Sequence, residues 1–199
     1  MPNNLPTLFL VRHGDTEWTE LHKHTGRTDI PLSPRGVESA RRLGQHLQRY
    51  GFSRVFTSPL QRAARTCALA GYEQVAVIDD DLVEWDYGAF EGMLTADIRR
   101  QHPDWELFQD GCPGGESPDD VASRADRFVA RVRELEGDVL AFSSGHIIRA
   151  IAARWLGLPV TAGRCFYCRP ASLGTLSFEH DNIEEPVVTL WNDVMQTGG

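Results

Sequence analysis

Short apolar runs alternate with segments of helical spacing along this chain, and this alternation is what most constrains its fold. The apolar run at residues 7–12 meets a glycine-containing loop, as buried strands do, whereas apolar residues after position 36 recur at helical spacing. The alternation predicts an α/β fold with a mostly parallel sheet sandwiched by helices. The predicted strands span 7–12, 54–57, 74–78, 138–143, 173–179 and 186–193, and the predicted helices span 34–50, 59–70, 118–135 and 145–156.

Serine–proline pairs mark the start of three of these helices. Serine accepts a hydrogen bond from a free N–H group of the first turn, and proline needs no partner there. The pairs are Ser33–Pro34, Ser58–Pro59 and Ser117–Pro118, and Asp120 adds a capping box to the third. Residues 79–92 lack a helical period and are predicted as a loop of the kind that often carries function.

A length of 199 residues suits one domain with its own core and is short for two, so we expect a single domain over residues 1–199. Residues 1–7 lack a basic stretch followed by a long apolar one, and the apolar run at 8–11 is too short for a signal peptide or a membrane span. We therefore expect a cytoplasmic protein with no membrane partner.

The balance of charge further limits the binding partners that we expect. The chain has 20 lysines and arginines against 28 aspartates and glutamates, a formal net charge of -8 at pH 7. This argues against a generally basic surface, so no nucleic-acid partner is expected, although a local cationic pocket is compatible with it. The cysteines are expected as free thiols without a metal, because the one Cys-x-x-Cys pair, Cys165 and Cys168, has no second pair or nearby histidine.

Chemically capable residues follow four of the predicted strands. In a parallel sheet the C-terminal ends of the strands lie at one edge, where ligands bind, so we expect these residues to converge on one crevice. They are Arg12-His13-Gly14, Arg62 in the helix after the second strand, Glu84, and Ser144-Gly145-His146.

His13 is the candidate nucleophile. A neutral imidazole has a free lone pair at pH 7, can attack phosphorus, and forms a phosphoramidate that water cleaves. The planar fork of donors on Arg12 suits phosphate oxygens, and Gly14 lets backbone amides approach an anion closely. From these residues alone, the alternative is a strand-end histidine that caps the following loop.

Ordered motifs over nearly the whole chain resemble the signature of the histidine phosphatase superfamily, in its phosphoglycerate-mutase-like branch 1. They are LVRHGDTEW (10–18), TG (25–26), LSPRG (32–36), TSPLQRAART (57–66) and GES (115–117). The resemblance implies a phosphoglycerate-mutase-like fold with a short cap segment at about residues 85–116. It implies no metal and no organic cofactor.

The resemblance also assigns roles. His13 becomes the transiently phosphorylated residue, while Arg12 and Arg62 clamp the phosphoryl oxygens and lower the pKa of the imidazole. Glu84 matches the proton donor, which protonates the leaving alkoxide and then helps to deprotonate water, with Asp86 as its rival. Further residues match positions that contact phosphate or substrate, with ordinary turn residues as the alternative for two of them, Thr19 and Thr25. These positions are Thr16, Thr19, Thr25, Gly26, Tyr87, Gly145 and His146.

One position departs from the family pattern. The family places a second histidine directly before the glycine that follows the fourth strand, and Ser144 stands there in this chain. Loss of one preorganised donor costs roughly 3 to 4 kcal/mol, about 10² to 10³ in rate. Three explanations stay open: a deliberate substitution that traps substrate, a natural variant that relies on His146 or water, and a pseudoenzyme that binds phosphate esters without turnover.

The cap segment separates two reactions of the family. Mutases need additional cationic residues there, but residues 102–114 contain no lysine or arginine, and Thr95 stands where a lysine is expected. We therefore expect a phosphatase acting on a small phosphorylated metabolite and impaired by Ser144, with a phosphoglycerate mutase and a non-catalytic phosphate-ester binding module as alternatives. Residues 79–95 are especially similar to the fungal sedoheptulose-bisphosphatase branch, which hints at a sugar phosphate or bisphosphate. A homodimer is left open.

Overall fold

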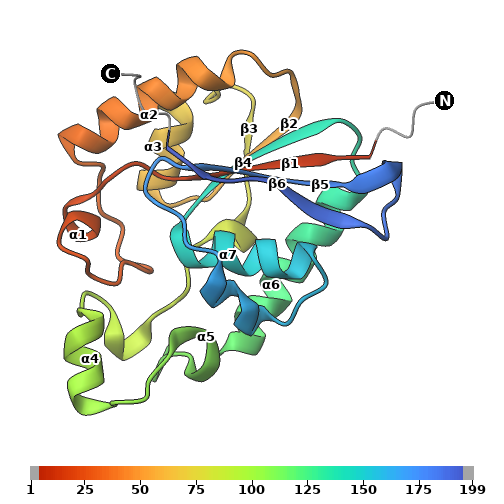
Figure 1. Ribbon diagram of the computed structural model, residues 1–199. Coiled ribbons are helices and arrows are strands. Elements are labelled where there is room, and N and C mark those ends of the chain that lie inside the picture. Colours follow the sequence, from red (N-terminus) through yellow and green to blue (C-terminus); the bar gives the residue numbers. More distant parts are fainter. Residues whose placement is uncertain (1–4, 195–199) are drawn as a thin grey trace.

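The computed structural model describes residues 5–194 and centres on one six-stranded sheet (Figure 1). The strands lie in the order β3-β2-β4-β1-β5-β6. They are β1 (Thr7–Arg12), β2 (Phe52–Thr57), β3 (Ala76–Ile78), β4 (Asp138–Ser143), β5 (Leu173–Phe178) and β6 (Pro186–Asp193). The first four pair in parallel, whereas β5 runs antiparallel to β1 and β6 antiparallel to β5. The predicted mostly parallel α/β sheet is confirmed, and the two closing strands are its antiparallel part.

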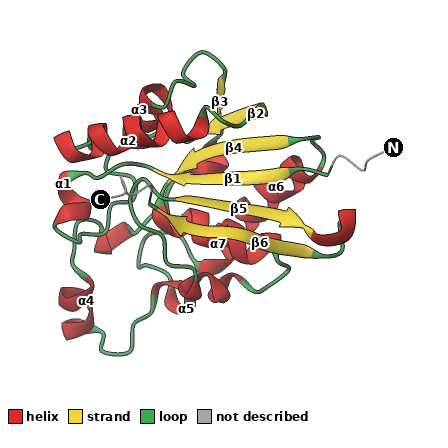
Figure 2. Cartoon of the chain, turned by 45° about the horizontal axis from the view of Figure 1, so that its top comes forward, coloured by secondary structure: helices red, strands yellow, loops and turns green. Residues whose placement is uncertain are grey.

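Two pairs of helices cover the two faces of this sheet (Figures 1 and 2). One face carries α2 (Pro34–Leu47) and α3 (Gln61–Leu69), and the other carries α6 (Pro118–Arg133) and α7 (Gly145–Trp155). In β1 the alternate residues Leu8 and Leu10 pack into the core cluster that contains α6 and α7 side chains. Phe9 and Val11, between and after them, pack into the cluster that contains α2 and α3 side chains. A strand buried on both sides has to be apolar at successive positions, which explains the run seen in the sequence.

The start of α3 differs from the prediction. Helices α2 and α6 begin at their prolines under the predicted serine caps. In contrast, α3 begins at Gln61 rather than Pro59, because Ser58 continues the pairing with β4 by donating its N–H to Phe142 O (2.9 Å). The cap comes from Asp29, whose Oδ1 accepts a hydrogen bond from Gln61 N (2.8 Å). A side chain from a distant loop therefore starts this helix.

Short elements escaped the prediction, because periodicity cannot be read over one or two turns. Two of them, both 3-10 helices, lie within the loop predicted over 79–92. The missed elements are α1 (Glu17–Glu20), α4 (Thr95–Gln101), α5 (Leu107–Asp110) and the 3-10 helices Asp80–Leu82, Gly88–Phe90, Val160–Cys165 and Glu179–Asp181.

Residues 85–116, which hold α4 and α5, are joined to the loop that follows α1. An antiparallel bridge pairs Lys23 with Leu94. His24 N donates to Met93 O, and Gly92 N donates to His24 O, both at 2.9 Å. Helices α1 and α4 both lie on the side of the sheet toward which β1 and β4 point (Figure 2). The two segments therefore form one wall beside the strand ends.

Two further expectations concern membranes and thiols. Within residues 5–194, no helix combines the length and the apolar character needed to cross a membrane. All four cysteines are free, as predicted: Cys67, Cys112 and Cys168 are buried, and Cys165 is exposed.

Candidate active site

A cleft of about 1020 Å³ lies at the ends of β1 and β4. Its lining includes residues from three of the four predicted strand ends, and Arg62, from the fourth, is not among the lining residues. The predicted site residues that line it are Arg12, His13, Thr19, Thr25, Glu84, Tyr87, Gly145 and His146. The remaining predicted site residues are buried and do not line it: Thr16, Gly26, Arg62 and Ser144.

His13 is 2% exposed at the end of β1. Its Nδ1 lies 2.7 Å from Gly14 O, and since a carbonyl oxygen only accepts, Nδ1 carries the proton and Nε2 keeps a free lone pair. Burial, followed by the charges of Arg62 and Arg12, lowers the pKa of His13 well below its usual value. The expected neutral imidazole is therefore present, with burial rather than the arginines as the largest cause.

Arg62 is fully buried at the start of α3 and is held by the loop after α1. One Nη group donates to Thr25 O (3.1 Å) and Gly26 O (2.7 Å), and the other donates to Thr28 O (3.1 Å). Its Nε is buried and has no partner among the described residues. The contacts fix the plane of the guanidinium and leave the Nε donor free.

The loop that holds Arg62 is itself fixed by the segment after Glu84. Glu91 Oε1 accepts a hydrogen bond from Gly26 N (2.8 Å). A Cβ atom at Gly26 would lie 2.5 Å from Trp85 O, so only glycine fits there. This close approach gives Gly26 a packing role, and its predicted contact with substrate stays a prediction.

Thr16 and Thr19 form a reciprocal cap at the start of α1. Thr16 Oγ1 accepts from Thr19 N (3.2 Å), and Thr19 Oγ1 accepts from Thr16 N (2.8 Å). Thr16 is fully buried, whereas Thr19 reaches the cleft. Their predicted contacts with substrate also stay predictions.

Arg12 lies against the first turn of α7. Its Nη1 donates to Cys168 O (2.7 Å), and its buried Nε has no partner among the described residues. A Cβ atom at Gly145 would lie 3.2 Å from the Arg12 Cζ atom. The glycine after Ser144 therefore lets the helix approach the guanidinium closely.

Glu84 caps the N-terminus of α7. Oε1 accepts from Ile147 N (2.9 Å) and Trp85 N (2.8 Å), and Oε2 accepts from His146 N (2.9 Å). A carboxylate at a helix N-terminus satisfies free N–H groups and interacts favourably with the helix dipole. Sequence reasoning placed Glu84 near this helix but did not find this capping role.

Tyr87 and His146 form a close pair beside Glu84, with the Tyr87 hydroxyl 2.5 Å from His146 Nδ1. Burial raises the pKa of Tyr87 well above its usual value, and burial followed by the charge of Arg149 lowers the pKa of His146 well below its usual value. The hydroxyl therefore donates to a neutral imidazole. Because Nδ1 accepts, the proton of His146 is on Nε2, which makes that nitrogen a donor.

Ser144 occupies the N-cap position of α7 but makes no side-chain cap. It is fully buried, and its Oγ has no partner among the described residues. The reason lies next to it, since Glu84 has taken the N–H groups of His146 and Ile147. The hydroxyl does not line the cleft.

The charge of the cleft is opposite in sign to the charge of the chain. A concave surface with an excess of one charge attracts small ions of the opposite charge, here anions. Its lining carries six cationic side chains against three carboxylates: Arg12, Lys23, Arg35, Arg42, Arg149 and Arg169 against Asp15, Glu20 and Glu84.

Two residues of the cleft, His24 and Arg149, differ from what their sequence context suggests, which is a solvated loop residue and a partner of an acidic side chain. His24 packs beside Tyr87 with ring centroids 4.8 Å apart, and burial lowers its pKa to about 4. Arg149 donates to Gly163 O and Arg164 O (2.9 Å each) and stacks on a phenylalanine ring. Neither environment could be predicted from the sequence, because contacts between distant segments leave no periodic pattern.

Comparisons with known proteins find relatives over nearly the whole chain. The family model described as histidine phosphatase superfamily (branch 1) matches residues 8–194. An acid phosphatase of Mycobacterium tuberculosis is 42% identical over 177 residues, which cover 87% of each chain. Sedoheptulose 1,7-bisphosphatase of Saccharomyces cerevisiae is 33% identical over an alignment of 255 residues that covers 96% of this chain and 94% of the enzyme. That alignment is longer than the 199 residues here, so the yeast enzyme carries insertions.

A solved structure gives the same result in three dimensions. The protein of the open reading frame Rv3214 from Mycobacterium tuberculosis superposes with a TM-score of 0.88 and 37% sequence identity. The superposition covers 94% of this chain and 97% of the other.

Proposed function

The chain belongs to branch 1 of the histidine phosphatase superfamily, and we propose that it hydrolyses small phosphate monoesters through a phosphohistidine formed on His13. Phosphoryl transfer needs a nucleophile with a free lone pair, donors for the phosphoryl oxygens and an acid for the leaving group. The cleft and the residues behind it supply candidates for each.

The observation that carries the proposal is a pair of arginines that act on His13 and each keep one buried donor without an acceptor. Arg12 Nε and Arg62 Nε have no partner among the described residues. Buried donors are rarely left unpaired, so these two call for an explanation. The charges of both arginines lower the pKa of His13, which supports a position of their guanidinium groups near its imidazole. Phosphoryl oxygens are the acceptors that two arginines beside a neutral histidine would bind.

In the first step, His13 Nε2 attacks phosphorus, a P–N bond forms, and the bond from phosphorus to the leaving oxygen breaks. Arg12 and Arg62 neutralise the charge on the phosphoryl oxygens during transfer. Glu84 in its protonated form gives its proton to the leaving oxygen. In the second step water attacks phosphorus, Glu84 takes a proton from it, and the P–N bond breaks to release inorganic phosphate.

His146 and Tyr87 contact the departing part of the substrate in this scheme. The Nε2 proton of His146, fixed by the hydroxyl of Tyr87, is a neutral donor beside Glu84. Thr19, Thr25 and Gly145 line the rest of the cleft, and we keep their proposed contacts with substrate. Thr16 and Gly26 support the surrounding loops.

Ser144 weakens the reaction. An imidazole at this position would add a charged donor to the phosphoryl group, and Ser144 Oγ is buried without reaching the cleft. The same observation favours a second candidate function, a non-catalytic phosphate-ester binding module that keeps His13 and both arginines. Both candidates bind phosphate esters, and only the phosphatase hydrolyses them.

The proposed substrate is a sugar phosphate or bisphosphate. The cationic lining supports an anionic substrate, and the volume of the cleft leaves room for a group larger than a phosphoryl group. The yeast relative is named for a sugar bisphosphate, sedoheptulose 1,7-bisphosphate. We favour hydrolysis over mutase chemistry because residues 102–114 of the cap segment offer no lysine or arginine for a second acidic group.

A phosphate-release assay tests the proposal, with sugar phosphates, sugar bisphosphates and p-nitrophenyl phosphate as substrates. The chain is compared with Ser144→His and His13→Ala, and the transient phosphoenzyme is trapped by rapid denaturation and tested for the acid lability of phosphohistidine. Release that rises in Ser144→His, and disappears together with the phosphoenzyme in His13→Ala, supports the proposal. Folded Ser144→His protein that binds phosphate esters and releases no phosphate supports the binding module instead.

A further inference from the structure

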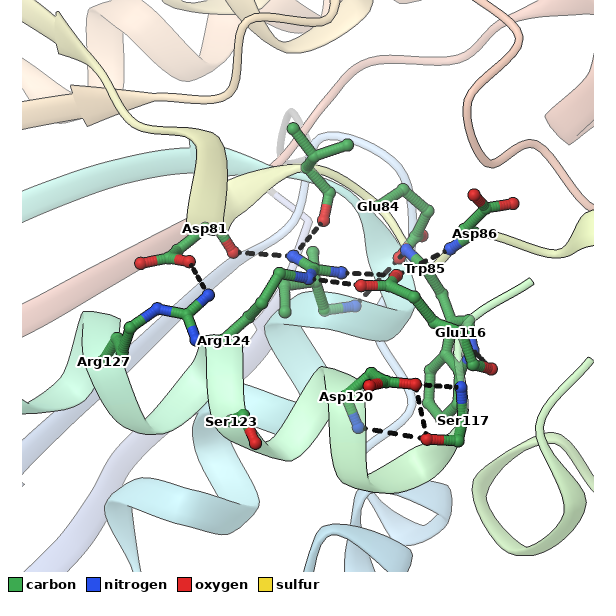
Figure 3. Close-up of polar contacts among 12 residues, drawn as sticks. Asp81, Glu84, Trp85, Asp86, Glu116, Ser117, Asp120, Ser123, Arg124 and Arg127 are labelled. Carbon is green, nitrogen blue, oxygen red and sulfur yellow. Dashed lines mark hydrogen bonds and ion pairs between the residues drawn. The ribbon is translucent and has the colours of Figure 1, made fainter.

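A buried ion pair lies behind Glu84 and outside the cleft (Figure 3). Arg124 Nε lies 2.6 Å from Glu116 Oε1, and Arg124 Nη2 lies 2.8 Å from Glu116 Oε2. The two side chains are only 10% and 15% exposed. Glu116 ends the cap segment, and Arg124 lies in the second turn of α6. Two parallel contacts to one carboxylate fix the orientation of both groups.

The pair holds the backbone on both sides of Glu84. Before Glu84, Arg124 Nη1 donates to Asp81 O and Val83 O, both at 2.9 Å. After it, Glu116 Oε2 accepts from Asp86 N at 2.9 Å.

The backbone of Glu116 adds two further contacts to the same segment. Its carbonyl oxygen accepts from Trp85 Nε1, and its N–H donates to Asp86 O, both at 2.9 Å. Residues 81–86 thus form a strap that is tied at four of its positions to two distant residues (Figure 3).

The strap has few hydrogen bonds of its own. It begins with the last two residues of the 3-10 helix Asp80–Leu82, and residues 83–86 belong to no helix or strand, so its conformation depends on contacts with other segments. One of these contacts is the hydrogen bond that Ser143 Oγ donates to Leu82 O (2.6 Å). A buried arginine whose three nitrogens all contact one carboxylate or two carbonyl oxygens adds a strong constraint, because each broken contact would leave a desolvated polar group. The carboxylate of Glu84 is thereby held against the first turn of α7.

We propose that Glu116 and Arg124 are a positioning pair that aligns Glu84 for proton transfer to the leaving oxygen. The inference rests on the proposed function, which gives Glu84 that role. The competing explanation is that the pair only joins α6 to the rest of the fold. The two explanations predict different effects of removing the pair on the hydrolysis of esters with different leaving groups.

A pair of substrates separates them. The P–O bond of p-nitrophenyl phosphate breaks to give a stable phenolate that needs no proton, whereas glycerol 2-phosphate releases an alkoxide that has to receive one. Misplacing a general acid therefore slows the alkyl ester and spares the aryl ester. A structural defect slows both.

The experiment measures kcat and KM for both esters in the Ser144→His background. Arg124→Met is expected to lower kcat for glycerol 2-phosphate by about tenfold or more, and kcat for p-nitrophenyl phosphate by less than about threefold. Glu116→Gln, which keeps the shape of the carboxylate, is the second variant and covers a folding failure of the first. Arg127→Met is the matched control, because Arg127 is on the same helix and pairs with the side chain of Asp81 rather than with the strap backbone (Figure 3).

Amide hydrogen exchange gives a readout that does not depend on activity. His146 N and Ile147 N donate to Glu84, so both amides should exchange faster in Arg124→Met and Glu116→Gln and remain unchanged in Arg127→Met. Equal losses on both esters, or unchanged exchange at these two amides, would overturn the positioning role. Glu84→Gln distinguishes a failure of the positioning proposal from a failure of the proposed function. If this variant hydrolyses both esters at the parent rate, the proton-donor role of Glu84 is wrong. Amide exchange alone then decides whether the pair positions the strap.

Discussion

The two halves of the phosphoryl site are built in different ways. In the half formed by β1 and α3, Arg62 donates to three carbonyl oxygens of a loop that closes around it. In the half formed by α7, the free N–H groups of the helix go to the carboxylate of Glu84, and the residue at the N-cap, Ser144, makes no cap. In the first half the functional group also holds the fold together. In the second half Glu84 makes the cap, so residue 144 is separated from the task of starting the helix.

The separation explains how the chain tolerates serine at this position. The helix start depends on Glu84, so residue 144 can change without leaving the N–H groups of His146 and Ile147 unpaired. Serine in place of histidine therefore lowers the reaction rate, because one donor is lost, and leaves the stability of the fold unchanged. In contrast, a substitution of Arg62 should lower stability, because three carbonyl oxygens would lose their donor at once.

Removing Arg62 should give the largest effect. In the Ser144→His background, Arg62→Met should lower kcat/KM for any phosphate ester by roughly 10³-fold or more, because an arginine on the transferring phosphoryl group is worth 10³ to 10⁵ in rate. It should also lower the melting temperature, since buried carbonyl groups lose their partners. Arg65→Met, on the exposed side of the same helix, is the control. An equal melting temperature for both variants would contradict the structural role of Arg62.

Substitutions at Ser144 should change activity and spare stability. Ser144→His should raise kcat by about 10² to 10³, the value of one preorganised donor. Ser144→Ala should leave kcat within about threefold and the midpoint of urea unfolding unchanged, because the Oγ atom makes no hydrogen bond to a described residue. Steady-state kinetics and urea titrations check both. A clear loss of stability in the alanine variant would show that residue 144 does help to start α7.

Loss of the Tyr87 hydroxyl should have a moderate effect on the α7 half. Tyr87→Phe removes the group that keeps the His146 proton on Nε2, so kcat/KM for sugar phosphates should fall by roughly tenfold, the value of one hydrogen bond. Tyr167→Phe, at a largely exposed tyrosine of the same cleft, serves as control. An unchanged rate in Tyr87→Phe would mean that the tautomer of His146 plays no part.

The smallest effect on catalysis is expected at His24. The pKa of His24 is lowered to about 4 by burial, so the unfolded chain binds more protons than the folded chain between pH 6.5 and 4. His24 therefore destabilises the fold progressively as the pH falls through this range. His24→Gln should remove roughly 1 to 2 kcal/mol of this acid destabilisation and leave stability at pH 7.5 nearly unchanged. Urea unfolding between pH 4 and 7.5 measures it.

A nearby exposed histidine provides the comparison for that measurement. His22 lies two residues before His24 with a positive φ of 58°, a conformation that asparagine tolerates, so His22→Asn is the control. The pH dependence of unfolding should stay as in the parent in that variant. If the stability of His24→Gln fell with pH in parallel with that of the parent, burial of His24 would not be the cause of the acid destabilisation.

The sequence predicted the elements whose pattern is local. All six strands and four longer helices lie where apolar runs, helical spacing and serine caps placed them, within a few residues. The convergence of Arg12, His13 and Glu84 also followed, since parallel strands end at one edge. The failed helix start at Pro59 has a local cause that no propensity could show, because Ser58 remains paired with β4.

Contacts between distant segments were decided only by the tertiary structure. The sequence determined the alternation of strands and helices, the identity of the candidate nucleophile and the presence of serine at position 144, because each is written in neighbouring residues. It did not determine that Glu84 caps α7, that Asp29 starts α3, or that Arg124 holds the strap. Each of these joins a side chain to backbone groups tens of residues away, and which groups meet is set by how the helices and loops pack around the sheet.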